Sequence, residues 1–252
     1  MKRFISEAGN SFSGYFTAVR FINKNKLWTY ILGAAFFNLF AFAFVGIVAW
    51  LYTGKLIDAF YSFLSFPETY QEWSGILQIL LSIGIRLLLL VMYFSLFKYI
   101  ILFIFAPVLA FISEKTQNIL HQEKRVLKIH FVLRDIIRGM ILALILISLQ
   151  LVCWLILLLL CFSLPFLAPF YALLLFFVES FFFGASMMDY RNEYFHLSVK
   201  QSLDKIFYHK GFTFGNGLAL NLFILVPVIG VLIGPPIAVI AAAIGANKLI
   251  KP

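Results

Sequence analysis

Charged residues are scarce in this chain, and their scarcity excludes an ordinary soluble protein. Asp, Glu, Lys and Arg make up 12% of the 252 residues and hydrophobic types make up 63%, whereas a soluble domain has about 25% charged residues. A soluble protein of this size needs more polar side chains to cover its surface. No stretch is polar enough for a separate soluble module, so the composition predicts a single membrane domain over residues 1–252.

The sequence also lacks the residue patterns of catalytic and metal-binding sites. It contains no HExxH, GxSxG, P-loop or dinucleotide-binding glycine pattern. Its histidines, which have no metal-ligand spacing, are His121, His130, His196 and His209. Asp189 and Glu193 stand near His196, a grouping typical of a solvated loop face. We therefore expect no enzymatic activity, no cofactor and no metal.

Long runs without charge predict an all-α polytopic membrane protein with long transmembrane helices. Residues 27–54 carry no charge and exceed the ~20 residues that cross a bilayer. Residues 73–113 are apolar except for Arg86 and Lys98. A continuous helix of that length would measure about 60 Å, so it either extends beyond the membrane or breaks near Pro107. We favour a span over 76–97.

Two further apolar stretches predict helical hairpins. Residues 139–188 are interrupted by Pro165 and Pro169, which indicates helices over 139–164 and 170–188. Residues 212–247 contain several glycines and prolines that divide them into arms of roughly 15 and 13 residues, or ~20 Å each. Neither arm would reach across ~30 Å of hydrocarbon. We therefore expect a re-entrant hairpin that enters from the cytoplasm and turns near Gly230.

The N-terminal residues 1–26 are basic and mildly amphipathic. Apolar side chains recur at three- and four-residue steps, at Phe4, Ile5, Ala8, Phe12, Tyr15, Phe16, Val19 and Ile22. This pattern predicts a helix on the inner membrane surface, with a solvated arm as the alternative. The segment lacks the apolar core of a signal peptide, so we expect it to remain in the mature protein.

The basic residues are distributed very unevenly along the chain, whose net charge is +9. Of the 20 Lys and Arg, 17 lie in residues 1–26, 114–138, 189–211 and 248–251. The positive-inside rule places these segments and both termini in the cytoplasm, and the acidic segment 55–72 outside. We expect a protein of the plasma membrane, in bacteria the inner membrane. Its basic residues would face anionic lipid of the bilayer, and no nucleic acid is expected as a partner.

Three blocks of sequence carry a resemblance to a known family. They are Tyr15-Phe16 with Phe21-Ile22, Leu27-Trp28-Thr29-Tyr30 and Asn38; then Ala106-Pro107-Val108-Leu109 with Ile112-Ser113-Glu114; then Asp189-Tyr190, Gly211-Phe212, Gly215, Pro227, Gly234-Pro235-Pro236 and the Ala-rich segment 238–246. In their order and spacing these blocks resemble the CysZ sulfate-transporter family and the etoposide-induced-protein-like membrane proteins.

The resemblance implies two long spanning helices, shorter hairpins that penetrate partway, a homo-oligomer and the passage of a small inorganic anion. Members that handle sulfate carry a Gly-Leu-Arg step before the first span, which Lys26, Leu27 and Trp28 replace here. Lys24 and Lys26 keep positive charge nearby and are candidates for anion binding. Because the arginine is missing, the resemblance implies an anion without fixing sulfate as that anion.

Arg86 and Glu179 are the two ionisable residues expected near mid-bilayer. Arg86 would lie about 18 Å along its helix from Lys98, and Glu179 about 15 Å from Asp189. An isolated cation there costs about 2.5–3.5 kcal/mol or more, so the two are expected to be neighbours. Arg86 either meets an anion in a pathway or forms a purely structural pair with Glu179.

Gly234 is a further candidate because Pro235 and Pro236, which follow it, suit the first turn of a helix. Free N–H groups at such a helix start would face an anion. The alternative is a tight turn buried by oligomer packing. Two functions therefore stay open, a channel or carrier for a small inorganic anion and a membrane-embedded scaffold or assembly protein without transport.

The predicted topology can be tested by labelling single cysteines from outside the cell. A probe introduced at Ser65 should react, and one at Ser198 should not, because the basic segments lie inside. Strong labelling from outside at position 198 would overturn the topology.

Overall fold

A computed structural model describes residues 2–33, 106–122, 129–226 and 229–249, with single positions 35, 36, 39, 40, 43, 44, 46, 47 and 83. The chain forms two compact units, Met1–Gly33 with Pro107–Pro252, and Ala34–Ala106. The second unit lies almost wholly outside the described residues. The predictions for most of segments 27–54 and 73–113, for 55–72 and for Arg86 therefore stay predictions.

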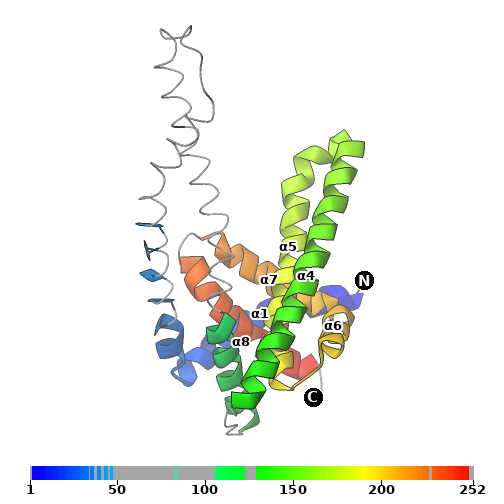
Figure 1. Ribbon diagram of the computed structural model, residues 1–252. Helices are drawn as coiled ribbons and strands as arrows, with labels where there is room; N and C mark the ends of the chain where they lie inside the picture. The colour runs from blue at the N-terminus through cyan, green and yellow to red at the C-terminus, as the bar shows by residue number, and fades with distance from the viewer. Residues whose placement is uncertain are drawn as a thin grey trace. The chain divides into compact units, whose positions relative to one another are not determined.

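The described residues are almost entirely helical and contain no strand, which confirms the all-α fold (Figure 1). The elements in chain order are α1 (Lys2–Lys24), a helix over residues 106–121, α4 (Ile129–Ser163), the 3-10 turn η2 (Pro165–Phe170), α5 (Tyr171–Tyr194), α6 (Val199–Tyr208), α7 (Lys210–Ile224) and α8 (Ile229–Leu249). The segments 114–138 and 189–211, expected as loops, are thus largely helical where they are described.

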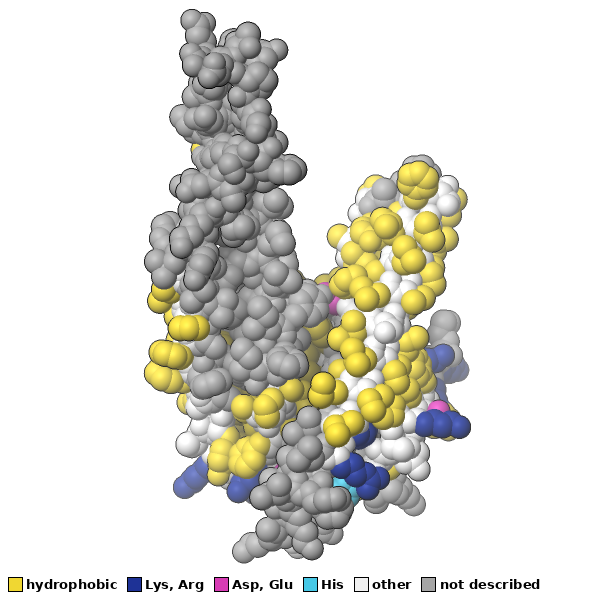
Figure 2. Space-filling view, in the orientation of Figure 1, with side chains coloured by type: hydrophobic (Ala, Val, Ile, Leu, Met, Phe, Trp, Pro, Cys, Tyr) yellow, Lys and Arg dark blue, Asp and Glu magenta, His cyan; other side chains and the backbone are white. Residues whose placement is uncertain are grey.

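Helices α4 and α5 form a hairpin around η2, at the two prolines where the sequence predicted a break. Large apolar side chains cover α4 on several sides, and among those more than half exposed are Leu144, Ile147, Leu151, Leu155 and Leu158. Figure 2 shows this apolar surface on the hairpin, with Lys and Arg gathered away from the η2 turn. Soluble proteins rarely expose so large an apolar surface to water, and both helices are long and apolar enough to cross a membrane, so the hairpin is membrane-embedded.

Helix α1 is present, and its buried face overlaps in part with the apolar face that the spacing predicted, because Tyr15 and Ile22 are buried. The buried residues of α1 lie mostly at steps of three and four and combine small, polar and large types, Glu7, Ser11, Gly14, Tyr15, Ala18 and Ile22. Ile5 and Phe16, by contrast, are 63% and 76% exposed. The inward face lies against α7 and α8, so α1 is part of the helical bundle and not a solvated arm.

Helix α7 lies between α1 and α5 and touches both through glycines. A Cβ atom added at Gly211 or Gly215 would lie 2.5–2.8 Å from backbone atoms of Phe4 or Ala8 in α1. A Cβ atom at Gly217, on another face, would overlap the carbonyl oxygen of Ser180 in α5. The side chain of any other residue at these positions would push the helix backbones apart, so the interfaces depend on glycine.

The junction of α7 and α8 corrects the predicted position of the turn. Helix α8 already begins at Ile229, and the Gly230 N–H donates to the Val226 carbonyl at 2.9 Å. Pro235 and Pro236 therefore lie inside α8 and not in a first turn. With 21 residues, α8 is long enough by length and composition to cross a membrane. Of the two helices, α7 with its 15 residues is too short to cross the hydrocarbon of a bilayer. The re-entrant arrangement stays a prediction.

The packing of α8 on α7 explains why two prolines are tolerated within a helix. Each proline removes one backbone donor and normally kinks or breaks a helix. Gly230 lies against the backbone of Phe223, and a Cβ added at Gly234 would meet Leu220 at 3.2 Å. This close contact with α7 stabilises α8 where its own hydrogen bonds are incomplete.

The glycine interface predicts opposite effects for two Gly→Ala substitutions. Gly217→Ala should destabilise the protein by about 1–3 kcal/mol, because the new methyl group overlaps α5. Gly9→Ala is the matched control, since nothing lies within 4 Å of its added Cβ and alanine favours a helix by up to ~1 kcal/mol. Thermal unfolding in detergent measures both; a Gly217→Ala variant as stable as Gly9→Ala would contradict the interface.

Candidate functional site

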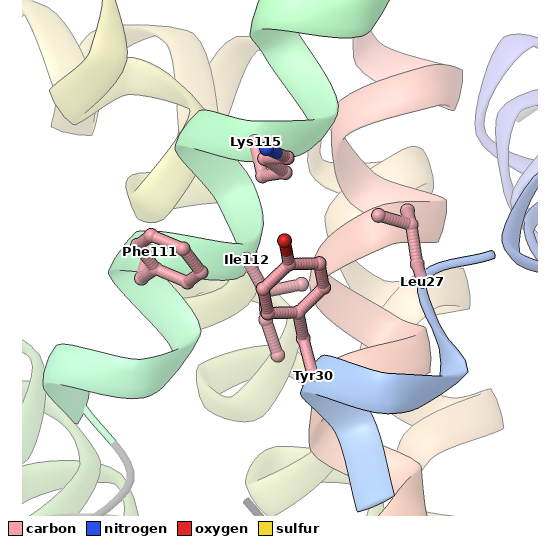
Figure 3. Close-up of a pocket in the computed structure, with 5 residues that line it drawn as sticks. All are labelled: Leu27, Tyr30, Phe111, Ile112 and Lys115. Carbon is pink, nitrogen blue, oxygen red and sulfur yellow. The ribbon is translucent and has the colours of Figure 1, made fainter. Parts of the chain in front are cut away.

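A hollow lined by Leu27, Tyr30, Phe111, Ile112 and Lys115 lies between the segment after α1 and the 106–121 helix (Figure 3). Its walls are apolar and aromatic, with the Tyr30 and Phe111 ring centroids 5.5 Å apart. The one charged group in the lining is the Lys115 ammonium, 5.6 Å from the centre of the Tyr30 ring. The hollow therefore combines one cation and one phenol with an apolar wall, and it is too narrow to enclose a water molecule.

The end of α1 sets the position of Leu27 in this hollow. The Leu27 N–H donates to the Ile22 carbonyl at 3.0 Å and the Lys26 N–H to the Asn23 carbonyl at 3.4 Å. These two bonds form a Schellman motif, in which Leu27 and Ile22 make the accompanying apolar contact and both are buried. Lys26 occupies the left-handed position of the motif with φ 54°, where glycine is the usual residue.

Lys24 and Lys26, the predicted anion-binding lysines, are exposed and do not line the hollow. Trp28 donates its indole N–H to the Asn23 side chain, back toward α1. The cation of the hollow is instead Lys115, whose charge had indicated only the topology of segment 114–138. Lys115 is the first cation after the block around Pro107, so the sequence could have marked it as a candidate. That it lines the same hollow as Leu27 could not be predicted, because the two residues are far apart in the chain.

The structure leaves the predicted pair of Arg86 and Glu179 untested and places Gly234 inside a helix. Glu179 is half-buried on α5, and its expected partner Arg86 lies outside the described residues. Gly234 lies within α8, packed on α7, and the two residues after it are prolines without an N–H. The helix start on which the predicted anion contact depended is therefore absent at Gly234, and the role of Gly234 in anion binding stays a prediction.

A buried ion pair joins the open end of the α4–α5 hairpin and was missed from sequence. The Arg138 guanidinium donates two hydrogen bonds to the Asp189 carboxylate, at 2.9 and 2.6 Å. Ser202 adds a third donor at 2.6 Å, and Arg138 also binds the Leu197 carbonyl at 2.9 Å. Asp189 is thus not on a solvated loop face. The signal was available, because a hairpin of 139–164 and 170–188 places residues 138 and 189 opposite each other.

A second buried cation, Arg191, is fully shielded from solvent. Its Nε donates to the Asn247 side-chain oxygen of α8 at 2.9 Å, and its guanidinium lies 4.5 Å from the Phe195 ring centre. The Asn247 amide donates in turn to Gln117 on the 106–121 helix at 2.7 Å. This chain of contacts links α5, α8 and the 106–121 helix through polar groups.

The N-terminal helix is anchored by a third charged cluster. The Glu7 carboxylate accepts hydrogen bonds from Arg3 Nε at 2.9 Å and from His209 Nδ1 at 3.1 Å, and the Arg3 guanidinium lies 4.2 Å from the Tyr208 ring centre. Burial alone would raise the pKa of Glu7, but the hydrogen bonds from Arg3 and His209 outweigh it and the pKa is lowered. Glu7 therefore stays ionised and ties α1 to the α6–α7 junction.

Comparison with known proteins gives one finding that covers most of the chain. A family model described as sulfate transporter CysZ/etoposide-induced protein 2.4 matches residues 15–235, from within α1 to within α8. The match includes the hollow and the buried ion pair. No curated protein matches the chain.

The Schellman motif predicts opposite effects of glycine at two neighbouring lysines. Lys26→Gly should raise the stability by up to about 1 kcal/mol, because it relieves the left-handed backbone at φ 54°. Lys24→Gly should lower it by about 1 kcal/mol, because Lys24 is the last residue of α1. Thermal unfolding in detergent distinguishes them, and a loss of stability in Lys26→Gly would contradict the motif.

Proposed function

Since this chain belongs to the CysZ/etoposide-induced protein 2.4 family of membrane proteins, we propose that it is a transporter or channel for a small inorganic anion. The family match over residues 15–235 carries the proposal. The membrane-embedded hairpin is consistent with it, because a pathway for a hydrated ion through hydrocarbon needs a helical bundle around it.

The charges of the described residues favour an anion over a cation. The charged group in the lining of the hollow is the Lys115 ammonium, and the fully shielded Arg191 guanidinium lies in the same compact unit. The whole chain carries a net charge of +9. Positive groups in a water-poor environment raise the local concentration of anions.

The proposal extends to topology and assembly. The basic termini and the segments 114–138 and 189–211 face the cytoplasm of a bacterial inner membrane, as the charge distribution favours. Exposed apolar side chains on several sides of α4 provide room for both lipid and a second copy of the chain, so a homo-oligomer is part of the proposal. It includes no catalytic step and no cofactor.

A scaffold or assembly protein without transport is the second candidate function. Trp28 replaces the family arginine, and its indole N–H is used within the protein, on Asn23. Lys24 and Lys26, which keep charge near that position, lie outside the hollow. A member of the family that has lost its entry site for anions would show these features.

Flux measurements in liposomes decide between the two functions. Purified protein should carry chloride, phosphate or sulfate faster than protein-free liposomes do, and Lys115→Gln should reduce that flux several-fold because it removes the charge of the hollow. Lys24→Gln is the matched control and should leave the flux unchanged, since Lys24 does not line the hollow. Absence of flux for every anion would favour the scaffold.

A further inference from the structure

Two hydrogen-bonding groups on the 106–121 helix are buried and have no protein partner among the described residues. They are the Ser113 hydroxyl and the Gln117 side-chain nitrogen, Nε2. Ser113 is 1% exposed and Gln117 is fully buried. Because they are four residues apart, they lie on one face of the helix, with about 5–6 Å between their Cβ atoms.

The surroundings fix which end of the Gln117 amide is without a partner. Asn247 donates from its amide nitrogen to Gln117 Oε1 at 2.7 Å, while the Asn247 oxygen accepts from Arg191 Nε at 2.9 Å. The guanidinium therefore orients Asn247, and Asn247 orients Gln117. The Gln117 NH2 group remains as a donor, and a buried donor without an acceptor destabilises the protein.

The chemistry of these groups selects an anion as the ligand. An amide NH2 group can only donate, and a serine hydroxyl can rotate to donate. The nearest cation in this chain of contacts, Arg191, is one amide group away from Gln117. A metal cation would need oxygen acceptors, and the one Gln117 oxygen is already used by Asn247.

We infer that the face of the 106–121 helix bearing Ser113 and Gln117 is an internal binding site for a small inorganic anion. The Ser113 hydroxyl and the Gln117 NH2 group donate to the anion, and Asn247, which Arg191 orients, holds the Gln117 amide in the direction that this requires. The inference rests on the proposed function, because it names a place where the transported anion would lose part of its water. The neighbouring Glu114 is half-buried and not on the fully buried face.

Anion-dependent stabilisation of the purified full-length protein tests the site. The thermal midpoint is measured during titration with chloride, sulfate and phosphate, with gluconate as the control for ionic strength. At least one small anion should raise the midpoint of the wild type in a saturable way that gluconate does not reproduce. No saturable rise, which would mean that a water molecule occupies the site, overturns the inference.

Substitutions locate the effect. Gln117→Glu keeps the oxygen that Asn247 needs and replaces the donor by a repelling carboxylate, so the apparent affinity for the anion should fall at least tenfold. Ser113→Ala should weaken binding in the same direction, and it carries the test where Gln117→Glu does not fold. The matched controls Gln201→Glu and Ser148→Ala, both at exposed positions, should bind as the wild type does. Equal affinity in all five proteins contradicts the site.

Flux measured in liposomes with the same variants tests the binding site and the transport function independently of each other. Wild-type flux that Gln117→Glu leaves unchanged would overturn the site while the transport function stands. Binding that is lost in Gln117→Glu, together with no flux of any anion in the wild type, would overturn transport while the site stands.

Discussion

The close approach of α7 to its neighbours is the contact on which the rest of the described structure depends. Gly211 and Gly215 admit the α1 backbone on one face, and Gly217 admits α5 on another. Hydrogen bonds cross both interfaces as a consequence: Tyr15 donates to the Asn216 carbonyl at 2.7 Å, and Asn221 donates to the Phe176 carbonyl at 3.2 Å. Between membrane helices such close packing and hydrogen bonding replace the hydrophobic effect as the source of association.

The same bundle explains how a chain in lipid carries buried charges. Arg138 and Asp189 neutralise each other with two direct hydrogen bonds, and Ser202 and the Leu197 carbonyl satisfy further atoms of the pair. A buried ion pair is tolerated only when its remaining polar atoms are also bonded. The pair lies at the end of the α4–α5 hairpin opposite the η2 turn, where it joins α4 and α5 to the segment that leads into α6.

The 106–121 helix contributes residues to both candidate anion sites of the described unit. One side of this helix contributes Ile112 and Lys115 to the hollow. The adjacent, fully buried side contributes Ser113 and Gln117, whose unpaired donors contrast with the saturated bonds around Arg138. Both sides present donors or positive charge, so one helix supports the anion hypothesis through two separate observations.

The sequence alone determined the membrane class, the all-α fold and the break at Pro165 and Pro169, because charge-free length and proline act locally on the chain. It did not determine which residues of α1 are buried most deeply, because Gly211 and Gly215 of α7 admit the α1 backbone at Phe4 and Ala8. It also placed the start of α8 at the prolines, whereas packing on α7 lets the helix begin at Ile229. The contacts of Lys115 with Tyr30 and of Gln117 with Asn247 join residues far apart in the chain. Only the tertiary structure decides such contacts, because the relative position of two helices depends on the shapes of both surfaces and not on the pattern of either.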